Sequence, residues 1–308
     1  MEFLIPVPDN DYYLWQMLVQ IAHFREMGYE QDAHYLVVYF GQPSERLRRL
    51  YESDELGCYI HAYLDTREDR SYSASMAPWV LGEFFAQFPE QVSKTFNFLD
   101  PDCIFTHQMD FSPYEEDDGC WYGSDTRSYS GADYIREKGE PLFHEICEIA
   151  GITPQQVLAH DRNSIGAQSF IRGAGADFWH NVASKSTRAY RHMVATADQY
   201  SPEGKGPIQA WCAYLYVQQY ETILHGYTPI ADDRLQFHWA NHDAAAWDER
   251  AYFHNAGVVA ENGRDFCKIT WQKSPFHREI TVSPESASSR YVDLIRRTEQ
   301  MFPDLVWE

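Results

Sequence analysis

The chain has 308 residues, of which 44% are hydrophobic and 16% aromatic, a composition typical of an ordered globular protein. Its 46 acidic and 25 basic residues give a formal net charge of −21, which disfavours binding along an extended nucleic-acid track. No run approaches the roughly 18 apolar residues that a membrane span needs. The six cysteines are widely spaced, without a Cys-x-x-Cys pair, and are expected to be reduced core thiols of a cytoplasmic protein.

The first 105 residues alternate between apolar, strand-like runs and segments with helical spacing. The predicted strands cover residues 2–8, 33–41 and 58–64 and an apolar run from Phe96, and the predicted helices cover 13–22, 44–53 and 76–88. Residues 9–11 supply a helix N-cap signal, and Gly28 supplies a helix stop. This alternation predicts an α/β fold with a mostly parallel sheet flanked by helices, and we interpret residues 1–110 as a nucleotide-binding half.

The remaining residues, 111–308, are expected to complete the same single domain with a more helical half and late chemical elements. Long amphipathic helices are predicted over residues 176–199 and 207–224, joined by a loop rich in proline and glycine. The aromatic residues of these helices, Trp179, Trp211, Tyr214 and Tyr216, are expected to lie in the core.

Two carboxylates, Asp100 and Asp102, follow the apolar run that begins at Phe96. In an extended chain, residues two apart face the same side, so both side chains could meet one cation where a strand ends. Hard divalent ions such as Mg²⁺ and Mn²⁺ are often bound by one or two carboxylates together with substrate phosphates. The motif therefore predicts a metal site, although a solvated turn is a plain alternative.

Histidines gather late in the chain, in Phe237-His238-Trp239-Ala240-Asn241-His242-Asp243 and in Phe253-His254-Asn255-Ala256-Gly257. His238, His242 and Asp243 could form an iron site with two histidines and one carboxylate, or could be hydrogen-bonded loop residues. Lys268 and Lys273 could neutralise a diphosphate, but surface positions are expected for both.

Several segments, in order, resemble those of GT-A glycosyltransferases, in particular the group of hydroxyproline O-arabinosyltransferases and peptidyl-serine galactosyltransferases. The similarity spans about residues 1–275. The matching segments are Tyr13-x-Trp15-Gln16, Leu99-Asp100-Pro101-Asp102-Cys103-Ile104-Phe105, Ser164-Ile165-Gly166-Ala167-Gln168 with Phe178-Trp179, Ile208-Gln209-Ala210-Trp211 and Phe253-His254-Asn255-Ala256-Gly257-Val258.

This resemblance implies a Rossmann-like GT-A domain over residues 1–308 that moves a hexose or pentose from a nucleotide-diphosphate sugar, a UDP-sugar by analogy, to a hydroxyl acceptor. The acceptor could be a glycan, a protein or a modified nucleobase, and the reaction is expected to retain the anomeric configuration. The ion, Mn²⁺ or Mg²⁺, would be held by Asp100, Asp102 and His254, and Asp102→Asn is expected to abolish metal-dependent donor binding without loss of the fold. The donor would contact Pro6, Pro8, Asp9, Asn10, Gly166, Ala167 and Gly257, and the catalytic candidates are Gln168 and Asp243.

One departure from the family concerns the catalytic carboxylate. The related enzymes carry an acidic residue soon after the tryptophan matched by Trp211, whereas Cys212 and Ala213 follow it here. If transfer inverted the anomeric centre, Asp243, Asp232 or Asp233 would be the candidate bases. Two other functions would use the same features: a metal-dependent phosphohydrolase or nucleotidyltransferase acting on nucleotide sugars, and a non-catalytic carbohydrate-binding protein.

Overall fold

The computed structural model describes residues 1–116, 119–204 and 206–308, and the chain forms two compact units. The first unit contains Met1–Asp65, Leu99–Phe111 and Arg234–Glu308. The second unit contains Thr66–Phe98 and Ser112–Asp233. The C-terminal segment therefore belongs with the N-terminal strands and with the segment that carries Asp100 and Asp102.

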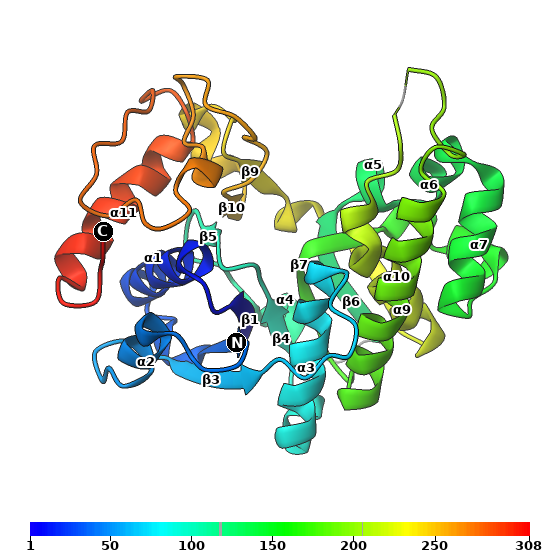
Figure 1. Cartoon of the computed structure of the whole chain (residues 1–308), viewed down its shortest axis with the longest axis horizontal. Helices are drawn as coiled ribbons and strands as arrows, with labels where there is room; N and C mark the ends of the chain where they lie inside the picture. Colours follow the sequence, from blue (N-terminus) through cyan, green and yellow to red (C-terminus); the bar gives the residue numbers. More distant parts are fainter. Residues whose placement is uncertain (117–118, 205) are drawn as a thin grey trace. The chain divides into compact units, whose positions relative to one another are not determined.

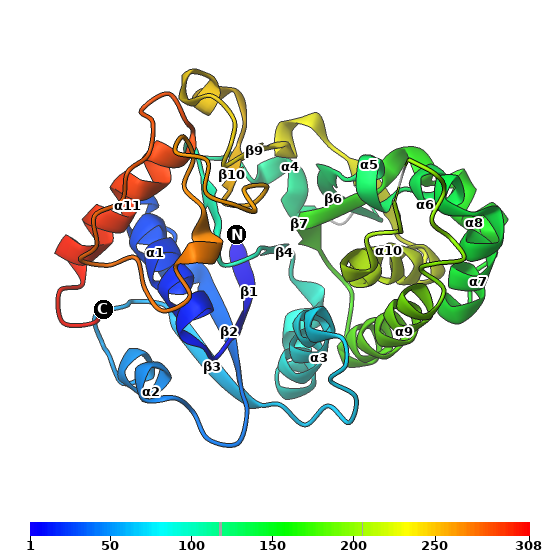
Figure 2. The same cartoon turned by 45° about the horizontal axis from the view of Figure 1, so that its top comes forward.

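Three parallel strands in the order β3-β2-β1 form the centre of the first unit (Figure 1). They are β1 (Glu2–Pro8), β2 (Ala33–Tyr39) and β3 (Tyr59–Leu64), and the helices are α1 (Asp11–Met27), α2 (Glu45–Tyr51) and α11 (Ser288–Met301). Helix α1 packs on β1, and α11 lies beside α1 (Figure 2). A smaller sheet in the order β5-β10-β9 is built from β5 (Cys103–Phe105), β9 (Phe237–Trp239) and β10 (Tyr252–His254).

The second unit combines a four-stranded sheet segment, in the order β4-β7-β6-β8, with most of the helices. Its strands are β4 (Phe96–Phe98), β6 (Cys120–Asp125), β7 (Ile165–Ile171) and β8 (Thr228–Ala231). Its helices are α3 (Met76–Gln87), α4 (Ser112–Glu115), α5 (Arg127–Ser130), α6 (Ala132–Lys138), α7 (Glu140–Ala150), α8 (Pro154–Ala159), α9 (Ala176–Ala195) and α10 (Ala213–Leu224). Helix α9 packs against α3, α7 and α10.

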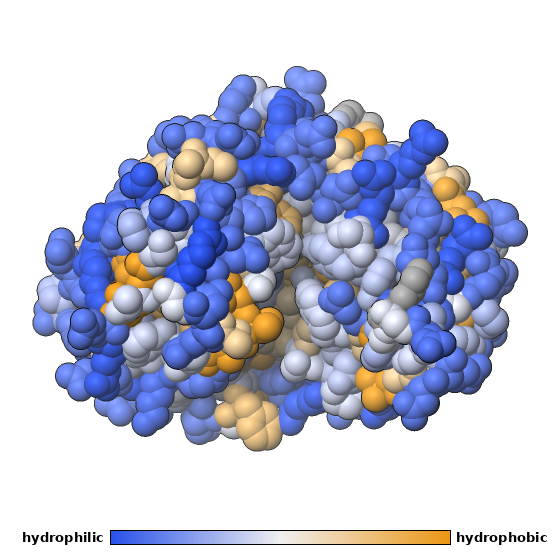
Figure 3. All heavy atoms as spheres, turned by 90° about the horizontal axis from the view of Figure 1, so that it is seen from above, coloured by the Kyte–Doolittle hydropathy of each residue, from blue (hydrophilic) through white to orange (hydrophobic). Residues whose placement is uncertain are grey.

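The strand pairings confirm the predicted class, a mixed α/β fold with a mostly parallel sheet flanked by helices. β1–β2, β2–β3 and β6–β8 are parallel, whereas β4–β7 and β6–β7 are antiparallel. Within the described ranges, no helix is both long and apolar enough to cross a membrane. The face drawn in Figure 3 is mainly hydrophilic and carries separate hydrophobic patches, in keeping with the high acidic content of the chain.

Helix α1 begins and ends at the signals that the sequence carries. Asn10 accepts a hydrogen bond from the backbone N–H of Tyr13 and so caps the first turn, and Gly28 closes the helix with a φ of 74°. The helix is buried along most of its length, and its Phe24 ring lies 4.9 Å from Phe3 of β1 and 5.8 Å from Phe105 of β5. This aromatic cluster joins the parallel strands to the smaller sheet, and so fixes the segment that carries the two aspartates.

Two expectations about the region around residue 210 are wrong. The predicted helix over 207–224 begins only at Ala213, after a 3-10 turn at Ala210–Cys212. Trp211 lies in that turn and is 56% exposed, whereas Trp179, Tyr214 and Tyr216 are buried as expected. The short turn places Trp211 outside the apolar face that a regular helix from residue 207 would have given it.

A buried histidine, His23, ties α1 to β5. Its Nε2 accepts a hydrogen bond from the backbone N–H of Phe105 at 3.1 Å, and the side chain is almost fully buried. Burial, with a smaller effect from Arg297, lowers the pKa of His23 from 6.5 to about 3. The imidazole is therefore neutral in the folded chain at pH values where it is protonated in the unfolded chain.

This difference predicts a loss of stability in acid. Because the unfolded chain takes up the proton first, the free energy of unfolding should fall as the pH drops from 6.5 towards 3, by up to about 5 kcal/mol from this group. His23→Gln keeps a hydrogen-bond acceptor but does not titrate, so its unfolding free energy should depend less steeply on pH across this window. Urea denaturation at a series of pH values would measure this, and identical slopes for the two proteins would contradict the assignment.

Candidate metal centre

Asp100 and Asp102 lie in a turn that precedes β5, not in an extended strand. The backbone N–H of Cys103 donates to the carbonyl of Asp100 at 3.1 Å, and that of Leu99 donates to the carbonyl of Leu4 in β1. The buried amide of Gln20, from α1, donates to the carbonyls of both Asp100 (2.9 Å) and Cys103 (2.6 Å). The predicted convergence of the two carboxylates is therefore reached by a clamped turn beside β1, and the extended geometry inferred from their spacing is wrong.

His254 reaches the same place through strand pairing. β10 runs antiparallel to β5, and His254 is the register partner of Cys103. Its Nε2 lies 3.4 Å from Oδ1 of Asp102 and 3.7 Å from Oδ2 of Asp100. Just beyond the strand, the backbone N–H of Asn255 donates to the carbonyl of Asp102 at 3.1 Å. Within the described part of the chain, Asp100, Asp102, Cys103 and His254 are the one group of His, Cys, Asp and Glu side chains spaced to hold a metal ion, with ligand atoms within 4.8 Å of one another.

Lys268 is a member of this site that was expected at the surface. Its ammonium forms an ion pair with the second carboxylate oxygen of Asp102, and its side chain is 18% exposed. It comes from a 3-10 turn, Lys268–Thr270, which is tied to α1 because the indole N–H of Trp15 donates to the carbonyl of Trp271 at 2.9 Å. Nothing in the local sequence distinguishes this lysine from an exposed one, since its partner lies 166 residues earlier in the chain.

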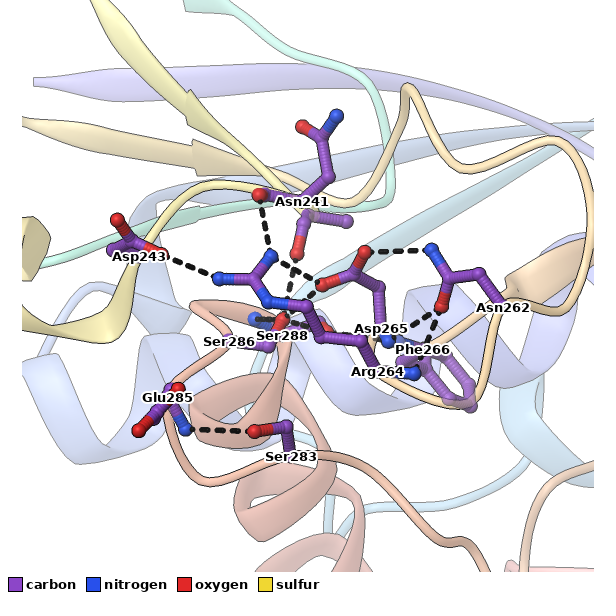
Figure 4. Close-up of polar contacts among 11 residues, drawn as sticks. Asn241, Asp243, Asn262, Arg264, Asp265, Phe266, Ser283, Glu285, Ser286 and Ser288 are labelled. Atoms are coloured by element: carbon purple, nitrogen blue, oxygen red, sulfur yellow. Dashed lines mark hydrogen bonds and ion pairs between the residues drawn. The ribbon is translucent and has the colours of Figure 1, made fainter.

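A polar network anchors the segment that leads to Lys268 (Figure 4). The guanidinium of Arg264 donates to the carbonyl of Asn241 (2.8 Å) and pairs with the carboxylates of Asp243 and Asp265. The hydroxyl of Ser286 donates to Asp265 at 2.6 Å, and that of Ser288, at the start of α11, accepts the backbone N–H of Phe266 at 2.8 Å. These contacts hold residues 262–266 against α11, just before the lysine.

The ionisable side chains of the site have pKa values that are shifted in different directions. Burial disfavours the charged form of Asp102, but Lys268 and His254 outweigh it and hold the pKa of Asp102 well below its ordinary value. Burial raises the pKa of Asp100; His254 partly offsets this rise, and Asp102 adds to it. Burial also opposes the charge on His254, but Cys103 and Asp102 together raise its pKa well above the usual value. Asp102 is thus held in its charged form, whereas the charged form of Asp100 is disfavoured.

The donor set fits a hard divalent cation. Two carboxylates and one imidazole suit Mn²⁺, which accepts oxygen and nitrogen ligands. A divalent ion would relieve the repulsion between two carboxylates that share one place. The thiol of Cys103 belongs to the same group of possible ligands, and burial raises its pKa above the ordinary value. The predicted ligands Asp100, Asp102 and His254 are therefore brought together, and Cys103 is a neighbour that sequence reasoning had placed only in the core.

The other candidate residues of the first unit have defined structural partners. The carboxylate of Asp9 accepts hydrogen bonds from the backbone N–H (2.7 Å) and hydroxyl of Ser44, at the start of α2. Pro6 and Pro8 belong to β1, and Gly257 has a φ of 86°, the left-handed conformation that favours glycine. The Asp243 carboxylate pairs with Arg264, and His238 and His242 approach each other with Nδ1 atoms 3.3 Å apart. Among the described residues these three do not form a metal-like cluster, so the iron-site alternative has no support.

The remaining candidates, Gly166, Ala167 and Gln168, lie in β7 of the second unit. Gln168 is fully buried, and its amide donates to the hydroxyl of Ser124 in β6 at 2.5 Å. A Cβ on Gly166 would lie 2.9 Å from Leu215 of α10. This glycine therefore lets the strand approach the helix closely.

Comparisons with known proteins give distant structural similarities. No family model matches the chain, and no curated protein matches its sequence. The galactosyltransferase LgtC, in a complex with donor and acceptor sugar analogues, is 14% identical over 96% of this chain and 95% of its own, with a TM-score of 0.43. An active-site variant of LgtC is 15% identical over the same shares, with a TM-score of 0.44. The bifunctional glycosyltransferase WbbM is 9% identical over 98% of this chain but only 51% of its own, with a TM-score of 0.45. At such low sequence identities and TM-scores, function has to be argued from the site itself.

The unequal charges predict that two similar substitutions will behave differently. Asp102→Asn removes the counter-charge of Lys268 and His254 and should lower the free energy of unfolding by roughly 3 kcal/mol. Asp100→Asn removes a carboxylate whose charge is disfavoured and should leave stability equal or higher. Both variants should lose Mn²⁺ binding, measured by electron paramagnetic resonance titration, with stability measured by urea denaturation in the presence of a chelator. Equal losses of stability for the two variants would contradict the charge assignment.

Proposed function

We propose that the chain is a metal-dependent glycosyltransferase that moves a sugar from a nucleotide-diphosphate sugar, a UDP-sugar, to a hydroxyl acceptor. The observation that carries the proposal is the clamped Asp100–Asp102 pair, joined by His254 and placed beside the first strand of a parallel α/β unit. Ligands of such folds bind at the carboxyl ends of the parallel strands. Pro8 and Asp9 stand at that end of β1, and Tyr39 stands at that end of β2.

In this proposal Asp100, Asp102 and His254 hold the divalent ion, which would neutralise the negative charge of the diphosphate leaving group. Lys268 keeps Asp102 ionised and in one orientation. Gln20 and the backbone of Asn255 fix the turn, so the carboxylates are positioned before any ligand arrives. We further propose that the nucleotide contacts Pro6, Pro8, Asp9, Asn10 and Gly257.

Retention of the anomeric configuration is part of the proposal, because the glycosyltransferases that the sequence resembles retain it. Asp243 pairs with Arg264, and Asp232 accepts a hydrogen bond from the hydroxyl of Tyr114 at 3.0 Å. Paired in this way, neither is an evident acceptor of a proton from the incoming hydroxyl.

Product analysis tests the function directly. The protein should release UDP from one member of a panel of nucleotide sugars with Mn²⁺ present, slowly to water and faster with the right acceptor, and chelator should abolish the reaction. Release of a sugar phosphate or of UMP would instead indicate a phosphohydrolase or nucleotidyltransferase. Sugar binding that is unaffected by chelator, without turnover, would indicate a carbohydrate-binding protein.

The nucleotide preference is a separate prediction. Calorimetry in the presence of Mn²⁺ should show at least tenfold tighter binding of UDP than of GDP, corresponding to about 1.4 kcal/mol. His254→Ala should weaken the binding of both diphosphates, since it removes a proposed metal ligand. Equal weak binding of the two, or a preference for GDP, would overturn the uridine assignment.

We propose separately that Gln168, in β7 of the second unit, contacts a hydroxyl of a sugar substrate. Gln168→Ala should reduce transfer roughly 30-fold, the scale of about 2 kcal/mol for one unsatisfied polar group, while UDP binding hardly changes. The matched control is Ser124→Ala, which breaks the same Gln168–Ser124 hydrogen bond from the other side. If both variants lose stability alike and both keep full turnover, Gln168 has only a structural role.

A further inference from the structure

The second unit contains a cavity of about 440 Å³ that the proposed metal centre does not use. It lies where residues 67–75 pass the helices α3 and α9, which pack side by side (Figure 1). Its size is within the range of small-molecule sites. Its chemical character is set by Arg67, Glu68, Trp79, Glu83, His180 and Arg188.

Part of the cavity wall is held rigidly. A Cβ on Gly82 would lie 2.3 Å from the His180 ring, so glycine at this position lets the ring of α9 lie against α3. His180 Nε2 is then 3.0 Å from the Glu83 carboxylate. Arg67 donates to the hydroxyl of Ser75 at 2.9 Å, and Ser75 is 1% exposed. The guanidinium of Arg67 and the carboxylate of Glu83 are thus each held in place by a neighbouring side chain.

Two donors in the cavity have no acceptor among the residues that the structure describes. The guanidinium of Arg188 makes no hydrogen bond or ion pair with any residue that the structure describes. Trp79 is only 8% exposed, yet its indole N–H also has no acceptor within the described ranges. By contrast Arg191, one turn further along α9, pairs with Asp69 at 2.9 Å and donates to Ser71. The indole N–H of the largely buried Trp79 and the exposed guanidinium of Arg188 thus face one cavity, where both can donate to a ligand rich in acceptors.

The charges around the cavity decide which acceptor fits. Guanidinium groups bind carboxylates and phosphates through parallel hydrogen bonds. Glu68 and Glu83 lie in the same wall and would repel a dianionic phosphate, whereas they can accept hydrogen bonds from hydroxyls. We propose that this cavity binds a saccharide that carries a carboxylate, with Arg188 and Arg67 on the carboxylate, Trp79 donating to a ring or hydroxyl oxygen, and Glu83 accepting hydroxyls.

This site does not rest on the proposed glycosyl transfer, because its residues belong to the second unit and its binding can be measured without turnover or metal. The probe is methyl β-D-glucuronoside, followed by isothermal titration or ligand-observed nuclear magnetic resonance with chelator present. The neutral methyl β-D-glucoside and glucose 6-phosphate distinguish a carboxylate from a plain sugar and from a phosphate.

The glucuronoside should bind saturably and at least tenfold more tightly than either control ligand. Arg188→Ala should weaken it about tenfold or more, Trp79→Phe should weaken it several-fold while keeping the packing, and Arg191→Ala, on the same helix, should leave it unchanged. Circular dichroism confirms that the variants fold. Absence of saturable binding, equal binding of the neutral glucoside, tighter binding of the phosphate, or unchanged affinity in a folded Arg188→Ala protein would each overturn the proposal.

Discussion

The negative charge of Asp102 is the constraint on which the rest of the first unit depends. A buried carboxylate is costly unless it is paired and hydrogen-bonded, and here Lys268 and His254 both lie against it. Those two partners come from the C-terminal segment, so the pairing draws residues 234–308 onto the N-terminal strands. Gln20, the β5–β10 register and the Arg264 network then hold each partner in place.

The different pairing of the two carboxylates also explains why the site would favour a bound cation. Asp102 is satisfied by the protein, whereas Asp100, 34% exposed on its side chain, is held near it without an equal counter-charge. A divalent ion would supply that charge, and a diphosphate would in turn supply the ion with oxygen ligands.

Much of this site could be predicted from local sequence. The alternation of strands and helices, the cap at Asn10, the stop at Gly28 and the three metal-ligand candidates are all visible as short patterns. The role of Lys268 was not, because it depends on a partner far away in sequence, and the position of Cys103 depends on a strand pairing that no local pattern encodes. The two carboxylates converge because the chain turns between two three-residue strands. Pro101 and the hydrogen bond from the backbone N–H of Cys103 to the carbonyl of Asp100 form this turn. The two-residue spacing of the aspartates alone could not reveal it.

The most direct test of the central claim is the hyperfine spectrum of the Mn²⁺-loaded protein with UDP bound. If Asp100, Asp102 and His254 form the metal centre of a nucleotide-sugar enzyme, the ion should show coupling to an imidazole nitrogen that disappears in His254→Ala, and coupling to phosphorus that appears only with UDP. A spectrum without nitrogen coupling in the native protein, or one that UDP leaves unchanged, would contradict the account.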